Sequence, residues 1–158
     1  MSVPAGTDDI DDADAFRCWL PAVPEARHWS GGHLTALAAD DLLFAARGTY
    51  FAEHVRWPGI GPHFWLVYRR MEIDYLREAF LGEQLRSGTR ALGRGRRSIQ
   101  LRQVLQVAAD QPRTIAVARL VVVAFDVTTR LAVDVPDGLW DAIASYEAGA
   151  RAERYPVR

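Results

Sequence analysis

Four polar side chains recur at a spacing of seven residues within an otherwise apolar segment. They are His33, Asp40, Arg47 and His54, in the Ala- and Leu-rich segment 30–54. Seven residues are nearly two turns of an α-helix, so on a helix the four would form a stripe that drifts only about 20° per step. Imidazole, carboxylate and guanidinium groups can transfer protons and stabilise developing negative charge. The stripe is therefore either a candidate catalytic site or a set of buried structural contacts.

The segment that carries this stripe has the composition of a buried helix. It contains no proline, and its apolar side chains occupy almost every side of the helical cylinder. Gly31 and Gly32 predict a turn at its start, and Thr35 is a candidate N-cap. We predict one helix over 30–54 that is packed inside the domain.

The rest of the chain is dominated by segments with the pattern of β-strands. They are 16–23 before the helix and 64–75, 83–92, 98–108 and 114–127 after it, with a closing helix over 137–150. The short connections between consecutive strands favour antiparallel pairing. A sheet of this kind beside a single apolar helix must wrap around the helix to bury it. The pattern predicts an α+β domain in which a five-stranded antiparallel sheet surrounds one central helix.

Composition and charge restrict the class of function. The chain has 158 residues, a formal net charge of -1 and one cysteine, Cys18. The balanced charge does not favour nucleic acid or an anionic membrane as a partner. A single cysteine cannot form an intramolecular disulfide or a cysteine-based metal cluster, and the four histidines lack paired ligand spacing. We expect neither a metal nor a cofactor.

The chain also lacks the sequence features of membrane insertion or export. Its longest apolar run, 115–125, is interrupted by Arg119 and is too short to span a bilayer. The N-terminus is acidic, whereas a signal peptide begins with basic residues. We therefore expect a cytoplasmic protein with one domain over 15–151, a disordered acidic tail at 1–14 and a C-terminal tail at 152–158.

Three short motifs in the strand region resemble those of a known family. They are Asp-Tyr-Leu-Arg at 74–77, Leu-Gly-Glu at 81–83 and Gly-Arg-Arg-Ser at 95–98. Together the residues 72–105 closely resemble the sheet signature of acyl-CoA thioesterases related to 4-hydroxybenzoyl-CoA thioesterase. Residues 121–143 resemble the last strand and C-terminal segment of that family, and Gly32-His33 followed by Arg47 resembles its helix opening.

This resemblance covers roughly residues 16–145 and implies the hot-dog fold, in which a curved antiparallel sheet wraps one helix. It also implies hydrolysis of thioesters of coenzyme A or acyl carrier protein. The acyl slot in the family lies between two subunits, so the resemblance implies at least a homodimer, with a tetramer as the other expected state.

The residues that usually catalyse this hydrolysis are missing from the chain. In the family, an Asp three residues before the helix glycine, or a Glu on the helix, activates water or attacks the carbonyl. These positions hold Trp29, Phe44 and Ala45, and such side chains cannot activate water. One interpretation is hydrolysis by another route, as in the enediyne polyketide thioesterases that the chain also resembles. The alternative is a non-hydrolytic protein that binds, cyclises or dehydrates a carrier-bound polyketide intermediate.

The remaining polar stripe supplies the candidate catalytic residues. We expect Arg47 to polarise the thioester carbonyl, together with amides after Gly32, and His33 or Asp40 to act on the water. On a helix no acid lies three or four residues from Arg47, so its alternative role is an ion pair with another strand or subunit. Asp40 and its neighbour Asp41 could instead stabilise the helix dipole, and His33 could form a structural hydrogen bond.

The resemblance to the family also suggests further residues that contact the substrate. We expect the acyl group to contact His28, Trp29, Gly32, Asp41 and Tyr50. A basic turn lies near the nucleotide end of coenzyme A in the family, and we expect it to bind coenzyme A or an acidic carrier protein. Its residues here are Arg94, Arg96, Arg97 and Ser98.

Overall fold

The structure is a computed structural model, and it describes residues 16–148. In chain order the elements are β1 (Cys18–Ala22), a 3-10 turn (Ala26–His28), β2 (Trp29–Ser30), β3 (His33–Leu34), α1 (Ala36–Thr49), a π-helical segment (Tyr50–Val55), β4 (Phe64–Tyr75), β5 (Leu85–Arg94), β6 (Ser98–Val107), β7 (Arg113–Asp126), β8 (Leu131–Ala132) and α2 (Asp137–Glu147). The predicted tails 1–14 and 152–158 lie outside the described residues.

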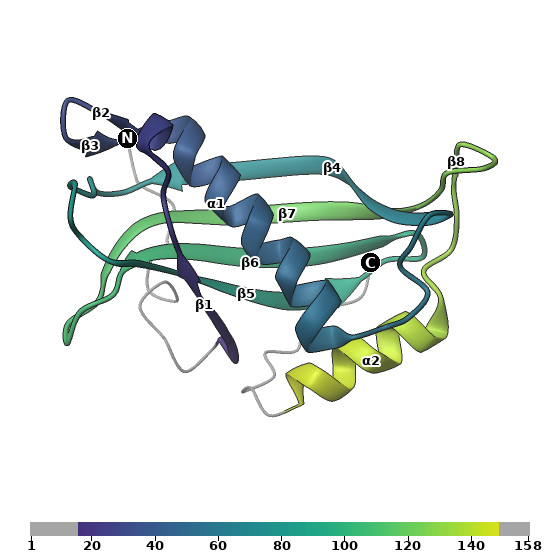
Figure 1. The fold of residues 1–158 in the computed structure, drawn as a ribbon. Coiled ribbons are helices and arrows are strands. Elements are labelled where there is room, and N and C mark those ends of the chain that lie inside the picture. Colours follow the sequence, from purple (N-terminus) through teal and green to yellow (C-terminus); the bar gives the residue numbers. More distant parts are fainter. Residues whose placement is uncertain (1–15, 149–158) are drawn as a thin grey trace, which may run out of the picture.

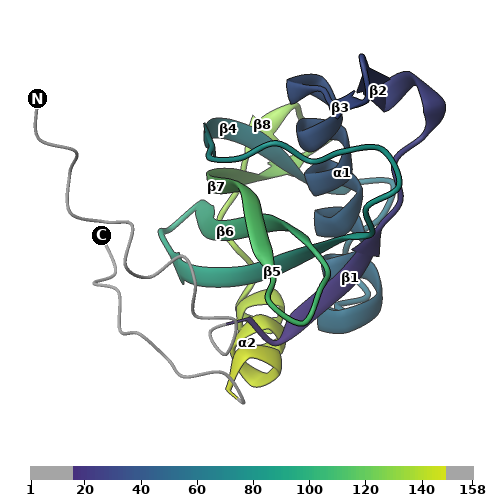
Figure 2. The same ribbon diagram turned by 90° about the vertical axis from the view of Figure 1, so that its left-hand side faces the viewer.

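The long strands form one antiparallel sheet in the order β1-β5-β6-β7-β4, and the short β8 pairs with β7. Helix α1 crosses one face of this curved sheet (Figure 1), and the turned view places the helix on one side of it (Figure 2). The predicted α+β hot-dog fold is confirmed, with β8 and the β2–β3 pair as additions to the five expected strands. Each of the five begins and ends within two residues of its predicted bounds.

One face of the sheet is buried against α1. Alternate residues of β6, namely Ile99, Leu101 and Leu105, are fully buried in the same apolar cluster as Leu43 of the helix. Gln103 lies in the same alternation, and its Nε2 donates a hydrogen bond of 2.9 Å to the backbone oxygen of Leu43. The strict alternation of this strand in the sequence thus reflects one face that packs on α1.

The prediction of one helix over 30–54 is wrong at its start. Gly31 and Gly32 have φ angles of +58° and +81° and connect β2 to β3, in which Trp29 pairs with Leu34. Two consecutive positive φ angles match the type I′ hairpin turn, a conformation that glycine adopts without a steric penalty. The helix begins only after Thr35, whose Oγ1 accepts a 3.2 Å hydrogen bond from the Ala38 amide. The predicted N-cap is confirmed.

The prediction also fails at the end of the helix and on its outer face. After Thr49 the backbone continues as a π-helical segment, which ends at Arg56 with a φ of +56°. The helix is not buried on all sides, because the sheet covers only one of them: Leu37 is 80% exposed and Phe44 56%. The four-residue stripe is therefore interrupted, with His33 in β3 and His54 in the π-helical segment.

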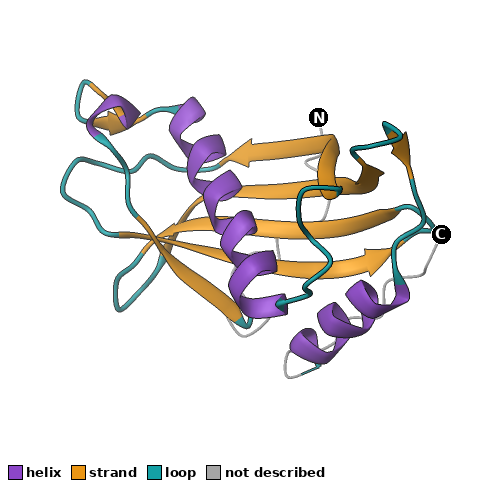
Figure 3. Cartoon of the chain, turned by 45° about the vertical axis from the view of Figure 1, so that its right-hand side comes forward, coloured by secondary structure: helices purple, strands orange, loops and turns teal. Residues whose placement is uncertain are grey.

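Helix α2 packs beside the end of α1, beyond the edge of the sheet (Figure 3). The hydroxyl of Tyr50 donates a 2.5 Å hydrogen bond to Oε1 of Glu147, and the Ala91 amide donates to the same oxygen at 3.0 Å. One carboxylate thus connects α2 to both the π-helical segment and β5. Tyr50 is fully buried at this junction.

Candidate functional site

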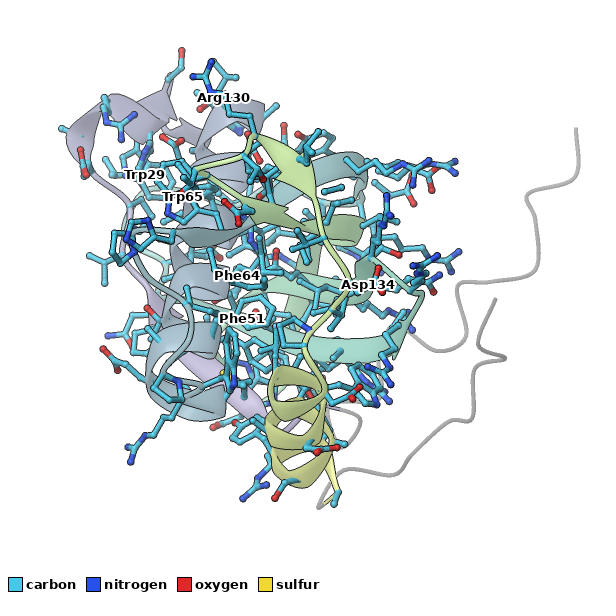
Figure 4. The ribbon with its side chains drawn as sticks, turned by 90° about the vertical axis from the view of Figure 1, so that its right-hand side faces the viewer. Trp29, Phe51, Phe64, Trp65, Arg130 and Asp134 are labelled. Carbon is cyan, nitrogen blue, oxygen red and sulfur yellow. The ribbon has the colours of Figure 1, made fainter. Side chains whose placement is uncertain are left out.

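A pocket of about 620 Å³ lies between the second half of α1, the loop that follows it and the start of β4. Its walls are largely apolar and aromatic, and the charged side chains among them are those of Arg47 and Arg56. The lining residues are Phe44, Arg47, Gly48, Phe51, Ala52, Arg56, Trp57, Pro58, Ile60, Trp65 and Leu66. Figure 4 shows Phe51, Phe64 and Trp65 gathered on this side of the molecule. Such a pocket suits an apolar ligand that carries a few polar groups.

Arg47 is the buried charge of this pocket. Its side chain is only 6% exposed, and its guanidinium carbon lies 3.8 Å from the centroid of the Tyr68 ring and 4.8 Å from that of Phe44. Within residues 16–148, Nη1 is buried without a hydrogen-bond partner. Burial lowers the pKa of Arg47 to about 10, against the opposing effect of the Asp40 charge. Arg47 is therefore a fixed cation with an unused donor.

Asp40 and Asp41 lie too far along α1 to stabilise its dipole from the first turn. The helix begins at Ala36, so no acidic residue lies in its first turn, and the dipole effect is short-ranged. Asp41 instead accepts hydrogen bonds from Arg27 Nη1 at 2.8 Å and from His28 Nε2 at 3.2 Å. These two contacts lower the pKa of Asp41.

Asp40 is the second residue of α1 with a buried polar atom that has no partner within residues 16–148. Its Oδ1 is buried without a hydrogen-bond partner in the described part of the chain. Asp40 precedes Arg47 by seven residues, which corresponds to roughly 10 Å along the helix axis. Its charge acts on both Arg47 and Tyr75, and it contributes to the raised pKa of Tyr75. Asp40 and Arg47 thus interact electrostatically, and no hydrogen bond or salt bridge joins them within residues 16–148.

His28 anchors the segment that carries Trp29. Its ring is buried, and the Glu25 amide donates to Nδ1 at 2.9 Å. Because Nδ1 accepts, the proton of the neutral ring lies on Nε2, which donates to Asp41. Trp29 itself is half-buried in β2. The observed contacts of His28 and Asp41 join the hairpin to α1, and their contact with a substrate stays a prediction.

His33 lies at the other end of α1 from the pocket. Its Nδ1 is 3.4 Å from Oε1 of Glu78, and its ring centroid is 5.0 Å from that of Phe80. Most of α1 separates it from Arg47, because Ala36, at the start of the helix, and Arg47 are eleven residues apart, roughly 16 Å along the axis. Gly32 lies in the hairpin turn, four residues before α1 begins. A single chain therefore does not bring His33 or Gly32 together with Arg47.

A second, smaller pocket of about 290 Å³ lies at this N-terminal end of α1. Leu34, Thr35 and Tyr75 are among its lining residues, and the Tyr75 hydroxyl donates to the Ala36 backbone oxygen at 3.3 Å. The predicted residues thus fall into two groups on one chain, with Arg47 at one end of the helix and His33 and Gly32 at the other.

Tyr50 belongs to neither group, since its hydroxyl is bound to Glu147 and it does not line the larger pocket.

The basic turn before β6 is paired with acidic residues that the sequence reasoning did not identify. Asp134 binds Arg96 at 3.0 Å and Arg97 at 3.3 Å, and Asp137 lies 3.4 Å from Arg94. These interactions lower the pKa of Asp134. Arg94, Arg96 and the two acids also line a pocket of about 530 Å³. Figure 4 shows Asp134 to the right of Phe64 and Phe51, on another part of the surface.

The residue immediately after the turn has a local structural contact. Ser98 is the first residue of β6, and its backbone oxygen accepts a 2.8 Å hydrogen bond from the Gly95 amide. This bond closes the turn that carries the arginines. Three arginines share two carboxylates here, so the turn keeps an excess of positive charge.

Several residues of the larger pocket were missed by sequence reasoning. Trp57, Ile60 and Trp65 line it, and Tyr68 holds the Arg47 side chain. The available signal was a group of aromatic residues in the loop after the helix and at the start of the next strand. These residues approach α1 because the loop after the helix folds back toward it. No local sequence pattern specifies this path.

Residues 16–148 contain neither a metal-binding cluster nor a helix that could span a membrane. No group of three or more His, Cys, Asp or Glu side chains there could hold a metal ion. None of the described helices has the length and apolarity needed to cross a membrane.

Comparison with known proteins adds independent information. The family model of the thioesterase-like superfamily matches residues 9–143. A search of curated proteins finds no match. A thioesterase from Thermus thermophilus, solved with coenzyme A and zinc, is 24% identical with a TM-score of 0.71, over 85% of this chain and 96% of that one.

Two further solved structures are similar at lower identity. A 1,4-dihydroxy-2-naphthoyl-CoA thioesterase from Synechocystis is 14% identical with a TM-score of 0.68, over 80% of this chain and 94% of that one. The dynemicin thioesterase, described in connection with polyene binding, is 18% identical with a TM-score of 0.70, over 81% and 95%. At these identities the likeness is one of fold.

Proposed function

Because the chain belongs to the thioesterase-like superfamily, we propose that it hydrolyses a thioester of an acyl or polyketide chain carried on coenzyme A or acyl carrier protein. The site lacks the usual catalytic Asp or Glu, since Trp29, Phe44 and Ala45 stand in their places. The observation that carries the proposal is the buried Arg47 guanidinium at the wall of an apolar pocket, with an Nη1 that has no hydrogen-bond partner among the described residues.

Arg47 is suited to stabilise the oxyanion of the reaction. When water attacks the thioester carbonyl, negative charge develops on its oxygen, and a fixed donor nearby lowers the barrier by about 3–4 kcal/mol. The Tyr68 and Phe44 rings hold the guanidinium in place without neutralising it. A buried N–H without an acceptor is also costly in the free protein. A substrate oxygen would therefore satisfy a group that the described part of the chain leaves unsatisfied.

The residue that activates the water is Asp40 or His33 in this proposal. Asp40 is supported by its position on the same helix as Arg47 and by its buried Oδ1, which no donor within residues 16–148 contacts. His33 is more exposed and is separated from Arg47 by most of α1. These observations favour Asp40 as the general base within one chain.

We further propose that the active protein is a homodimer or homotetramer. In the described part of the chain, the 12-residue strand β4 lies at the sheet edge and pairs only with β7 among the long strands. A long open edge tends to pair with another strand. Leu37 and Phe44 on α1 are large exposed apolar side chains that a second copy could cover. Such an arrangement would also place residues of two copies around one acyl slot.

The basic turn is the proposed contact for the carrier. Arg94, Arg96 and Arg97 keep excess positive charge beside a pocket, which suits the phosphates of coenzyme A or an acidic carrier surface. A carrier protein and coenzyme A can be distinguished by comparing the same acyl group on each.

The proposal is tested by release of free thiol from a series of acyl-CoA and acyl-carrier thioesters of several chain lengths, including polyene chains. We expect turnover that falls by about 100-fold or more when Arg47 is replaced by Ala. Tight binding without thiol release from any substrate would contradict hydrolysis. It would favour the alternative of a protein that holds, cyclises or dehydrates the chain, an alternative supported by the missing acid.

A further inference from the structure

Arg56 is the second arginine of the larger pocket, and the proposed chemistry does not use it. It ends the π-helical segment and adopts a left-handed conformation with a φ of +56°. Glycine is the usual residue at such a position, because a side chain there carries a steric penalty. π-Helical turns are also rare and often accompany functional sites. An arginine at this position therefore carries a steric cost that a glycine would not.

The local contacts of Arg56 account for only part of its guanidinium. Its Nε donates to the backbone oxygen of Glu53 at 2.5 Å, a common way to satisfy a carbonyl at a helix end. Among residues 16–148, the two terminal Nη groups have no acceptor within hydrogen-bond distance. The bond to Glu53 therefore orients the guanidinium and leaves its terminal donors available.

The pocket joins this second cation to the first. Arg56 follows Arg47 by nine residues: Arg47 lies in α1, and Arg56 lies just beyond the π-helical segment. Both line the same cavity, together with the flat side chains of Phe51, Trp57 and Trp65. A ligand that fills the cavity can therefore meet a cation at each of two separate places and aromatic surface on its walls.

We propose that Arg56 selects acyl groups that carry a carboxylate at the end remote from the thioester. This inference rests on the proposed function, in which Arg47 contacts the thioester carbonyl. The terminal donors of Arg56 match a carboxylate, which accepts paired hydrogen bonds from a guanidinium. The substrate class is then a flat, largely apolar acyl thioester with a distal carboxylate.

Binding can be measured without hydrolysis by using amide analogues, in which NH replaces the thioester sulfur. The matched pair is the coenzyme A amide of 4-carboxycinnamic acid and that of its 4-methyl ester, which differ in one charge and one methyl group. Trp57 and Trp65 line the pocket, so tryptophan fluorescence reports its occupancy. We expect the carboxylate to bind about 10-fold more tightly or better, as for a hydrogen bond to a charged group.

Two substitutions separate the charge from the backbone. Arg56→Met keeps the aliphatic stem and the left-handed backbone, whereas Arg56→Gly removes the side chain and relieves the unfavourable φ. Both should abolish the preference for the carboxylate, and Arg56→Gly should also raise the melting temperature. Arg130→Gly is the matched control: Arg130 has a φ of +60° but does not line the pocket. It should raise the melting temperature and keep the preference.

Equal binding of the two analogues by the unsubstituted protein would overturn the inference, as would a preference that survives both Arg56 substitutions. The proposed hydrolysis is judged separately by thiol release. A protein that prefers the carboxylate analogue through Arg56 but releases no thiol would contradict hydrolysis alone.

Discussion

The guanidinium carbon of Arg47 lies 3.8 Å from the centroid of the Tyr68 ring, so a residue of β4 holds the buried cation of α1. An aromatic face attracts a cation without cancelling its charge. An ion pair would have given Arg47 a structural partner, but the salt bridges of residues 16–148 include none with it. The ring contact therefore orients Arg47 and leaves its charge available for the proposed contact with an oxyanion.

Replacing Arg47 with Met should lower activity and raise stability. Loss of the donor is expected to reduce kcat by about 100- to 1,000-fold. The pKa of Arg47 is lowered to about 10, so the folded state binds this proton more weakly than the unfolded state. At neutral pH the charge thus opposes folding, and Met should increase the free energy of unfolding by about 1–3 kcal/mol.

The measurements are thiol release and chemical denaturation at pH 7. The stabilisation by Met should shrink only as the pH rises from about 10 toward the ordinary arginine value of about 12.5, where the charge is lost in both states. Arg119→Met is the control, because Arg119 is exposed on β7, and it should change neither quantity. Lower stability of Arg47→Met would indicate that the guanidinium has a structural partner in the assembled protein.

Substitutions at Tyr68 should separate the aromatic contact from the hydroxyl. Tyr68→Phe keeps the ring beside Arg47 and is expected to keep activity within about threefold. Tyr68→Leu removes the cation–π contact, worth about 1–2 kcal/mol for a buried cation, and should lower kcat by about 10-fold. Steady-state kinetics of both variants test this. Equal activity of the two would show that the ring does not position Arg47.

Asp40 and His33 can be compared through isosteric changes. If Asp40 activates the water, Asp40→Asn should lower kcat by about 100-fold or more, since an amide cannot accept the proton. His33→Asn should then have a much smaller effect. The readout is kcat as a function of pH for each variant, with circular dichroism as the check on folding. Full activity of Asp40→Asn would exclude it as the base.

Tyr50→Phe should lower the free energy of unfolding at neutral pH. It should also make this free energy depend less on pH under alkaline conditions. The change removes a hydrogen bond to the Glu147 carboxylate, at a cost of about 1–2 kcal/mol. Burial and the Glu147 charge raise the pKa of Tyr50, so the folded state favours the protonated phenol. The contribution of Tyr50 to the free energy of unfolding is fully present below its pKa in the unfolded state, which is about 10. This contribution declines as the pH rises above that value.

Chemical denaturation at pH 7 and at about pH 10.5 measures both effects. The unsubstituted protein should lose stability between these values more steeply than Tyr50→Phe. Tyr75→Phe is the comparison, because Tyr75 is 53% exposed and should change stability little at pH 7. Identical slopes for the unsubstituted protein and Tyr50→Phe would contradict the assignment.

Much of the fold could be predicted from local patterns. The strand 98–108 alternates strictly because one of its faces packs on α1, and β4 has the predicted bounds, Phe64–Tyr75. The helix was harder to delimit. Its spacing of seven suggested one continuous stripe, but two glycines of positive φ place His33 in a hairpin, and the π-helical segment changes the register before His54.

The sequence by itself determined the class of fold and the Thr35 cap, because each depends on residue types close together in the chain. Only the tertiary structure decided that Arg47 faces an aromatic pocket, that Asp41 binds Arg27 and His28, and that acids neutralise part of the basic turn. These contacts join residues that are distant in sequence. They depend on how strands and loops return to the helix, which no local periodicity encodes.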